Sequence, residues 1–257
     1  MIVLLTDFGN SDPYVGIMKG VIRSLHPTVE IVDLTHEVPP QNIAIAAFIL
    51  QNSYSYFPRK TIFVLVVDPG VGTMRKPVAI HKDGYYFVGP DNGCFAFLQE
   101  AETIVELNRS AYFRVANPDA TFHGRDIFSP IAAHLANGLA IQELGDVQDS
   151  LVSLSLDEWQ KQGDVVIIPH LHTDHFGNLI YSFGQEDWQT IVQGRTYWIE
   201  IGRERIASLS PHYQISEPLI AIFNSYHLFE IASPNGSAAA YLKEKGITSL
   251  EVRLHLS

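Results

Sequence analysis

The chain has 257 residues, 46% hydrophobic and 18% charged, which is the composition of an ordinary globular protein with one large or two smaller domains. Its formal net charge of -11 argues against nucleic-acid binding, which needs a basic face. No apolar run approaches the ~20 residues that cross a bilayer, and the amino terminus lacks the basic region of a signal peptide. The lone Cys94 favours a reducing compartment. We therefore expect a cytoplasmic protein without membrane contact.

Strand and helix signals alternate through the first half of the chain. Buried strands are expected over residues 2–6, 29–34 and 61–67. Helices are expected over residues 14–25, 42–51 and 126–137, the last closing at Gly138. Two apolar runs around Asp83-Gly84 predict a β-hairpin. This alternation predicts an N-terminal α/β domain with a largely parallel sheet.

Helix signals fade after Asp164, and short strands dominate. They are expected over residues 165–169, 179–183, 196–201, 219–224, 228–232 and 249–256. Such spacing predicts a small C-terminal β-barrel domain. The polar stretch 155–163 marks the boundary, which gives an α/β catalytic domain over residues 1–158 and a β-barrel domain over residues 159–257.

Polar residues follow the first and third predicted strands. In open α/β sheets ligands bind beyond the carboxyl ends of the strands, which draws attention to Asp7 and Asp12 after the first strand and to Asp68 and Arg75 after the third. Asp12 also precedes Pro13 and a helix, so it is equally a candidate helix cap. For Asp68 and Arg75 the alternative is an ion pair across a tight loop.

GVGTMR, residues 70–75, has the glycine content of a phosphate-binding loop. Such a loop must open a helix whose amino end faces the phosphates, whereas here the chain continues as a strand from Pro77. We therefore set this interpretation aside.

HLHTDH, residues 170–175, matches the spacing of a binuclear zinc cluster in the metallo-β-lactamase-like hydrolases. In those proteins the motif precedes a helix and several later ligands, whereas here a predicted strand follows and Asp187 is the only later aspartate. Polar residues at the rim of a barrel are the favoured interpretation, and a zinc hydrolase remains the alternative.

TFHGRDIF, residues 121–128, places His123 and Arg125 beside a helix start. A lone histidine at such a position is usually structural. Beside Asp68 and Arg75 it could instead complete a site that holds and deprotonates a water molecule, because the carboxylate accepts a proton and imidazole titrates near neutral pH.

Seven motifs occur together along the chain. They are TDFG (6–9), THEVPPQNI (35–43), VVDPGVGTMR (66–75), GPDNG (89–93), TFHGRDIF (121–128), DHFGN (174–178) and NSYHLFEIA (224–232). In this order they resemble the S-adenosyl-L-methionine hydroxide adenosyltransferases, also called adenosylmethionine hydrolases, which are relatives of the fluorinases and chlorinases. The resemblance implies an α/β domain, a β-barrel domain and a homotrimer whose ligand lies between one subunit's first domain and a neighbour's second.

The resemblance also implies the catalytic residues. The hydrolytic members carry an Asp-Arg-His trio that matches Asp68, Arg75 and His123. Halogenases have Tyr in place of this Asp, lack this His, and carry a long insertion where this chain has the compact Asp83-Gly84 hairpin. Water rather than halide is therefore the implied nucleophile.

Substrate contacts follow from the same resemblance. Asp7 would bind the ribose hydroxyls, Asp12 the methionine amino group, and Phe122 would line the site. The neighbour's contribution to adenine and methionine would be Asp174, Phe176, Asn178, Ser225 and Asn235. The chain departs from the family at His227, where relatives often have Gly, and at Pro234, which is unusual in the adenine-contacting loop.

The implied reaction is displacement at the ribose C5′ carbon by water, which converts S-adenosyl-L-methionine to adenosine and L-methionine without cofactor or metal. Arg75 stays protonated and cannot be the base, which leaves Asp68 or His123. Two alternatives stay open: the zinc hydrolase, and a non-catalytic protein that binds adenosylmethionine or adenosine.

Overall fold

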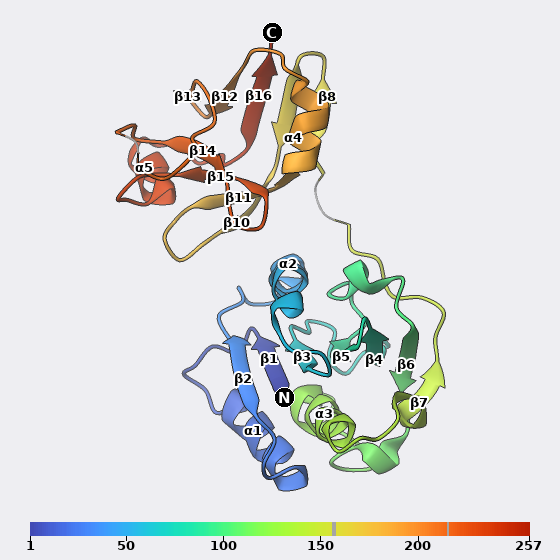
Figure 1. Cartoon of the computed structure of the whole chain (residues 1–257). Helices are drawn as coiled ribbons and strands as arrows, with labels where there is room; N and C mark the ends of the chain where they lie inside the picture. Colours follow the sequence, from blue (N-terminus) through green and yellow to red (C-terminus); the bar gives the residue numbers. More distant parts are fainter. Residues whose placement is uncertain (156–157, 215) are drawn as a thin grey trace. The chain divides into compact units, whose positions relative to one another are not determined.

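The computed structural model describes residues 1–155, 158–214 and 216–257. They form two compact units, the first over Met1–Ser155 and the second reaching Ser257 (Figure 1). The expected boundary between residues 158 and 159 stays a prediction, and residues 156 and 157 of the polar stretch around it lie outside the described residues.

The first unit contains a seven-stranded sheet. Its strands lie in the order β2 (Ile31–Thr35), β1 (Ile2–Thr6), β3 (Ile62–Val66), β5 (Tyr85–Pro90), β4 (Pro77–Lys82), β6 (Thr103–Leu107) and β7 (Gly145–Val147). The first four in this order are parallel, and β4 and β7 run the other way. The predicted α/β architecture with a largely parallel sheet is confirmed.

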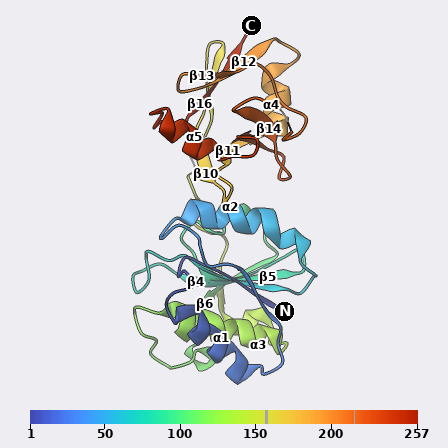
Figure 2. The same cartoon turned by 90° about the vertical axis from the view of Figure 1, so that its left-hand side faces the viewer.

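Helices cover both faces of this sheet. α1 (Tyr14–Leu25) and α3 (Ser129–Ala136) lie on one face and α2 (Ile43–Ser53) lies on the other (Figures 1 and 2). Val15, Met18 and Ile22 recur with helical spacing on α1 and are buried against the sheet. α2 begins where the Asn42 side chain accepts a hydrogen bond from the Ile45 amide at 3.0 Å.

Two local features differ in how well their sequence predicted them. The hairpin is confirmed: Asp83 and Gly84 both have positive φ, 51° and 76°, as a two-residue turn requires. The helix expected from residue 126 begins earlier, because a π-helical turn over Gly124–Phe128 precedes α3 and brings Asp126 into the interior.

The second unit consists mainly of antiparallel strands. One sheet has the order β10 (His170–Thr173), β11 (Leu179–Gly184), β15 (Leu228–Ala232) and β14 (Ile220–Phe223). The other has the order β13 (Glu204–Ile206), β12 (Tyr197–Ile201), β16 (Val252–Leu256), β9 (Val165–Ile168) and β8 (Gln160–Gln162). Both sheets contribute to one apolar core. The strand-rich second domain is confirmed, but within the described residues its strands pair as two separate sheets and do not close into a barrel.

Two short helices of the second unit were not expected from the sequence. α4 (Gln185–Val192) begins where the Gly184 amide donates to Asp187 Oδ2 at 3.0 Å. α5 (Ala238–Glu244) begins where Ser237 Oγ accepts from the Ala240 amide at 3.0 Å. Among the described residues, no helix has the length and apolar character needed to cross a membrane.

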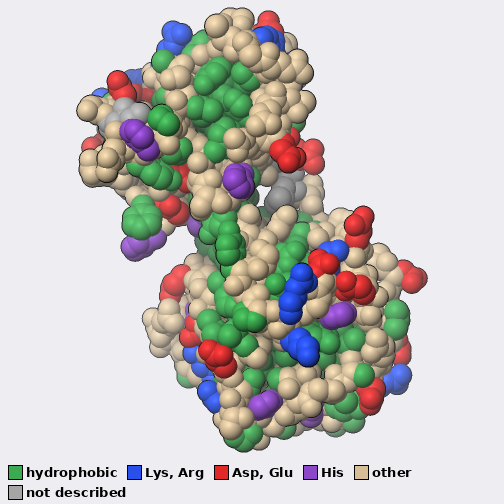
Figure 3. All heavy atoms as spheres, in the orientation of Figure 1, with side chains coloured by type: hydrophobic (Ala, Val, Ile, Leu, Met, Phe, Trp, Pro, Cys, Tyr) green, Lys and Arg blue, Asp and Glu red, His purple; other side chains and the backbone are tan. Residues whose placement is uncertain are grey.

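One face of the molecule shows how its charged side chains are distributed. On the face drawn in Figure 3, Lys and Arg lie among acidic and uncharged residues and form no broad basic area. Together with the net charge of -11, this gives no support to nucleic-acid binding.

Candidate functional site

A hollow of about 410 Å³ lies at the carboxyl ends of β1 and β3 in the first unit. Asp7 and Asp68 line it from the residues after these two strands, and Phe122 and His123 line it from the segment before α3. Its volume is in the range that accommodates a small-molecule ligand. The fold therefore gathers four of the residues singled out in the sequence around one cavity.

Asp68, Arg75 and His123 form one hydrogen-bonded group. Arg75 Nε donates to Asp68 Oδ1 at 3.1 Å, and Nη2 donates to Asp68 Oδ2. Nη2 also donates to His123 Nδ1 at 3.0 Å. The side chains of Asp68 and Arg75 are only 5% and 6% exposed, so this is a buried two-pronged pair and not the surface ion pair of the alternative interpretation.

A glycine allows the two loops that carry this group to approach each other. Gly72 has a φ of 75°, and a Cβ at this position would lie 2.3 Å from the carbonyl oxygen of Ala120. The 68–75 loop therefore lies directly against the segment that leads into His123. Gly72 of GVGTMR serves this contact, and β4 follows the loop where a phosphate-binding loop would need a helix.

Burial and the guanidinium set the protonation of the group. Burial raises the pKa of Asp68, and the charge and hydrogen bonds of Arg75 oppose that rise. Burial and the nearby Arg75 charge both lower the pKa of His123. Because a guanidinium can only donate, His123 Nδ1 must be the acceptor in their hydrogen bond, and the proton of the neutral ring lies on Nε2.

The two aspartates after β1 have different surroundings. Asp7 is partly buried in the hollow, and its Oδ2 accepts a hydrogen bond from the Gln41 amide at 2.7 Å. Asp12 is exposed and does not cap α1, because Pro13 occupies the cap position without a side-chain hydrogen bond. The capping interpretation of Asp12 is therefore wrong, and its carboxylate does not line the hollow.

Three of the singled-out residues in the second unit share the turn between β10 and β11. Asp174 accepts hydrogen bonds from the amide and side chain of Asn178 at 2.8 and 2.9 Å. Phe176 is 72% exposed at this turn. Gly177 has a φ of 83°, and a Cβ there would lie 2.0 Å from Ser237 Oγ, so the turn packs tightly against the start of α5. Asn235 belongs to the loop that leads into this helix start.

Ser225 lies apart from that group. It belongs to the turn between β14 and β15, where Asn224 Oδ1 accepts from the amides of Tyr226 and Leu228 at 2.9 and 3.2 Å. The β11–β15 register pairs Leu179 with Ile231 and Gly184 with Leu228, which places this turn at the opposite end of the ladder from Asn178. His227, in the same turn, has a φ of 59°, a conformation that glycine adopts more easily than a residue with a side chain.

The residues of HLHTDH are not clustered as metal ligands in the part of the chain that the structure describes. The first four residues are strand β10, and the described residues contain no group of three or more His, Cys, Asp or Glu that could hold a metal ion. A zinc site needs at least three such ligands. His170 instead forms a 3.0 Å hydrogen bond with Thr173. The zinc alternative is not favoured.

Sequence reasoning missed some lining residues. Phe8 and Tyr14 line the hollow together with Phe122, and their ring centroids lie 5.4 to 5.8 Å apart. Gln41 also lines it and has a φ of 65°, which is unusual for a residue with a side chain. The position of Phe8 directly after Asp7 was the available sequence signal, whereas nothing local marks Gln41.

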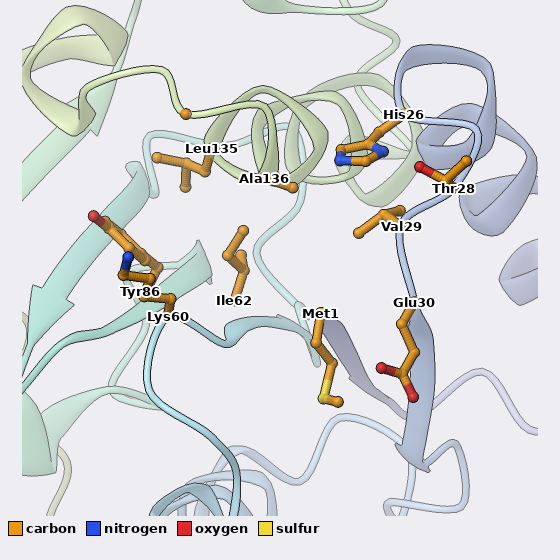
Figure 4. Close-up of a pocket in the computed structure, with 11 residues that line it drawn as sticks. Met1, His26, Thr28, Val29, Glu30, Lys60, Ile62, Tyr86, Leu135 and Ala136 are labelled. Carbon is orange, nitrogen blue, oxygen red and sulfur yellow. The ribbon is translucent and has the colours of Figure 1, made fainter.

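A second hollow, of about 560 Å³, lies at the other end of the strands. Figure 4 shows Met1, Glu30, Lys60 and Ile62 around it, with His26 and Leu135 from the helical layer. It shares no residue with the first hollow. It is larger, but it lies at the amino ends of β1, β2 and β3, away from the edge where open α/β sheets bind ligands. The smaller hollow is the candidate site.

Two family models match this chain. Residues 2–145 match the SAM hydroxide adenosyltransferase N-terminal domain, and residues 170–247 match the SAM hydroxide adenosyltransferase C-terminal domain. An (R)-S-adenosyl-L-methionine hydrolase of Thermus thermophilus is 36% identical over 260 residues, covering 95% of this chain and 96% of the relative. One of the same name from Methanocaldococcus jannaschii is 31% identical over 269 residues, covering 98% and 95%.

A solved structure is similar over its full length. The crystal structure of an uncharacterized conserved protein from Thermotoga maritima superimposes with a TM-score of 0.87 at 33% identity, covering 99% of this chain and 100% of that one. Because both domains match in order and the hydrolases align over nearly the whole length, this chain belongs to the SAM hydroxide adenosyltransferase family.

Proposed function

We propose that this protein hydrolyses S-adenosyl-L-methionine to adenosine and L-methionine. Two relatives that align over nearly the whole chain are named as hydrolases of this compound. The observation that carries the proposal is the hydrogen-bonded group of Asp68, Arg75 and His123, whose Asp68 and His123 line the hollow at the carboxyl ends of β1 and β3.

In the proposed reaction Asp68 is the base and the oxygen of a bound water is the nucleophile. The oxygen forms a bond to the ribose C5′ carbon, the C5′–S bond breaks, and its electron pair stays on sulfur, while a water proton passes to Asp68. The leaving group departs as a neutral thioether and needs no acid. Burial raises the pKa of Asp68 and so makes it a stronger base.

Arg75 and His123 hold this base and the water. Arg75 binds both oxygens of Asp68, which fixes the plane of the carboxylate. Its hydrogen bond to His123 Nδ1 leaves Nε2–H as a donor that can orient the water. Since Nδ1 is already engaged, His123 is not the base in this scheme.

The substrate contacts proposed for the first unit are Asp7 to the ribose hydroxyls, Phe122 as a wall, and Asp12 to the methionine amino group. Asp12 would meet the substrate at the exposed margin, since it does not line the hollow. Asp174, Phe176, Asn178, Ser225 and Asn235 would come from a neighbouring subunit of a homotrimer. We also propose that the protein works in the cytoplasm and needs no cofactor.

The decisive experiment incubates purified protein with S-adenosyl-L-methionine and separates the products by chromatography. We expect adenosine and methionine in equal amounts, and light scattering is expected to give the mass of a trimer. Tight adenosine binding without product would favour the non-catalytic alternative. A fully active monomer would contradict the shared site while leaving the reaction intact.

A further inference from the structure

The segment after β2 holds the loop that carries Asp7. Gly9 donates its amide to the His36 carbonyl at 2.8 Å, and the Val38 amide donates to the Thr6 carbonyl at 3.4 Å. The Gln41 amide donates to the Asp7 carboxylate at 2.7 Å. Residues 36–41 therefore contact the Asp7 loop at three points, although the sequence alone gave THEVPPQNI no role.

A buried side-chain contact joins the same two segments. Thr6 Oγ1 lies 2.9 Å from His36 Nδ1, and the two residues are 0% and 4% exposed. Thr6 Oγ1 also accepts a hydrogen bond from the Phe8 amide at 3.3 Å. The threonine hydroxyl has one proton that it can donate to Nδ1 while a lone pair accepts from the Phe8 amide, so one side chain can link His36 to the residue that follows Asp7.

The other ring nitrogen of His36 faces a charged group. Nε2 lies 3.1 Å from Asp33 Oδ1, although the pair does not meet the geometry of a hydrogen bond. The attraction between the ring and the carboxylate is therefore mainly electrostatic. Asp33 in turn pairs with Lys19 of α1 at 2.6 Å. The Asp33 carboxylate beside Nε2 favours the ring proton on that nitrogen, which leaves Nδ1 as the acceptor towards Thr6.

We propose that His36 is a positioning residue that acts through the Thr6 hydroxyl to fix the loop carrying Asp7. His36 does not line the hollow and has no part in the chemistry above. Any buried imidazole needs hydrogen-bond partners, and the partner of Nδ1 here belongs to the residue just before Asp7. The inference rests on the proposed function, because it assumes that Asp7 binds the ribose.

The test compares two variants of Thr6 that differ in the hydroxyl. Thr6→Val keeps the shape and removes the hydroxyl, and adenosine binding measured by calorimetry is expected to weaken about 5- to 30-fold, the range of one or two lost hydrogen bonds. Thr6→Ser keeps the hydroxyl and removes a buried methyl group, and its affinity is expected to stay within about twofold of the parent. A merely structural role predicts the reverse, with Thr6→Ser at least as harmful as Thr6→Val.

A double-mutant cycle tests whether the effect passes through Asp7. In an Asp7→Ala background, Thr6→Val is expected to cause no further loss of adenosine affinity. Additive losses would overturn the proposal.

A pair of His36 variants tests the other side of the same contact. His36→Asn keeps an acceptor near the position of Nδ1 and is expected to retain most of the adenosine affinity that His36→Leu loses. Equal losses of affinity in the two variants would also overturn the proposal.

Hydrogen exchange of the loop amides gives a readout that needs no ligand. The Phe8 and Gly9 amides are expected to exchange faster in Thr6→Val than in the parent or in Thr6→Ser. The three proteins are compared at denaturant concentrations that give them the same free energy of unfolding. Unchanged exchange in all three would overturn the positioning role. A parent protein that neither binds adenosine nor turns over S-adenosyl-L-methionine would overturn the proposed function instead, and the exchange result would still decide how the loop is held.

Discussion

Arg75 donates to His123 Nδ1 across 3.0 Å while it also binds both oxygens of Asp68. A guanidinium has no acceptor, so this single contact fixes which nitrogen of His123 is unprotonated. The sequence left Asp68 and His123 as equal candidates for the base. The contact favours Asp68 as the base, which has consequences for the Asp68→Asn variant and for the pH dependence of the activity.

Replacement of Asp68 by Asn keeps the shape of the side chain and removes its basic oxygen. Turnover is expected to fall by about two to four decades, the usual contribution of a general base, with a small change in substrate affinity. Kinetics of the purified variant, with thermal unfolding measured alongside, provide the check. A folded Asp68→Asn protein with nearly normal kcat would contradict the mechanism.

The pH dependence of kcat/KM reports the same group. Because burial raises the pKa of Asp68, activity should be present at neutral pH and be lost as the pH falls through a value above that of an ordinary aspartate. The lowered pKa of His123 keeps that ring neutral over the upper part of this range. In Asp68→Asn the residual rate should lose this acidic limb. An identical limb in both proteins would assign it to another group.

Asp7→Ala is expected to weaken adenosine binding by one to two decades, since hydrogen bonds to a charged group contribute about 1.5–3 kcal/mol. Calorimetry measures the change. Asp149→Ala is the matched control, because it removes one exposed carboxylate of the same unit outside the hollow. Equal affinities in the two variants would remove Asp7 from the site.

Asp126 should stabilise the fold in a pH-dependent way. Burial alone would raise the pKa of Asp126, but hydrogen bonds from Arg125 and Arg114 outweigh it and lower the pKa to about 2. The stabilisation is therefore present above about pH 4, where an unfolded Asp is ionised, and is lost as the pH falls towards 2. Linkage puts it at about 2–3 kcal/mol.

Urea unfolding of the parent and of Asp126→Asn between about pH 6 and pH 2 tests this, because that range runs from above the unfolded pKa down to the folded one. The difference in unfolding free energy between the parent and Asp126→Asn should be largest at the upper end of this pH range and should decrease as the pH falls. Asp149→Asn, an exposed carboxylate, should show little difference throughout. A difference for Asp126→Asn that does not vary with pH would mean that its charge is not what stabilises the fold.

Metal removal should leave the activity intact. The described residues offer no group of three potential ligands, and the proposed mechanism activates the water with the Asp68 carboxylate. Dialysis against a chelator is expected to preserve turnover, and added zinc is expected to give no increase. Activity that is lost on chelation and restored by zinc would instead favour a hydrolase built on HLHTDH.

Elements specified by consecutive residues were predicted well from the sequence. Helix α1 has a repeating apolar stripe, and the Asp83-Gly84 turn has the two residues that tolerate positive φ. Helix α5 was missed although SAAAYLKE contains its signals, a serine cap followed by strong helix formers. The prediction of a β-barrel was too specific, because the spacing of strands along the chain does not determine which strand edges pair in space.

The site was predictable only in part. Strand ends identified Asp7, Asp68 and Arg75 without any structure, because the carboxyl ends of parallel strands meet at one edge of a sheet. By itself, therefore, the sequence determined the alternation of elements, the carboxylates at that edge and, through its motifs, the family. The hydrogen bond between Arg75 and His123, the contact of Thr6 with His36 and the separation of Ser225 from Asn178 were decided by the tertiary structure. Each depends on strand order, strand register or a close approach such as Gly72 against Ala120, and these join residues far apart in the chain that no local pattern relates.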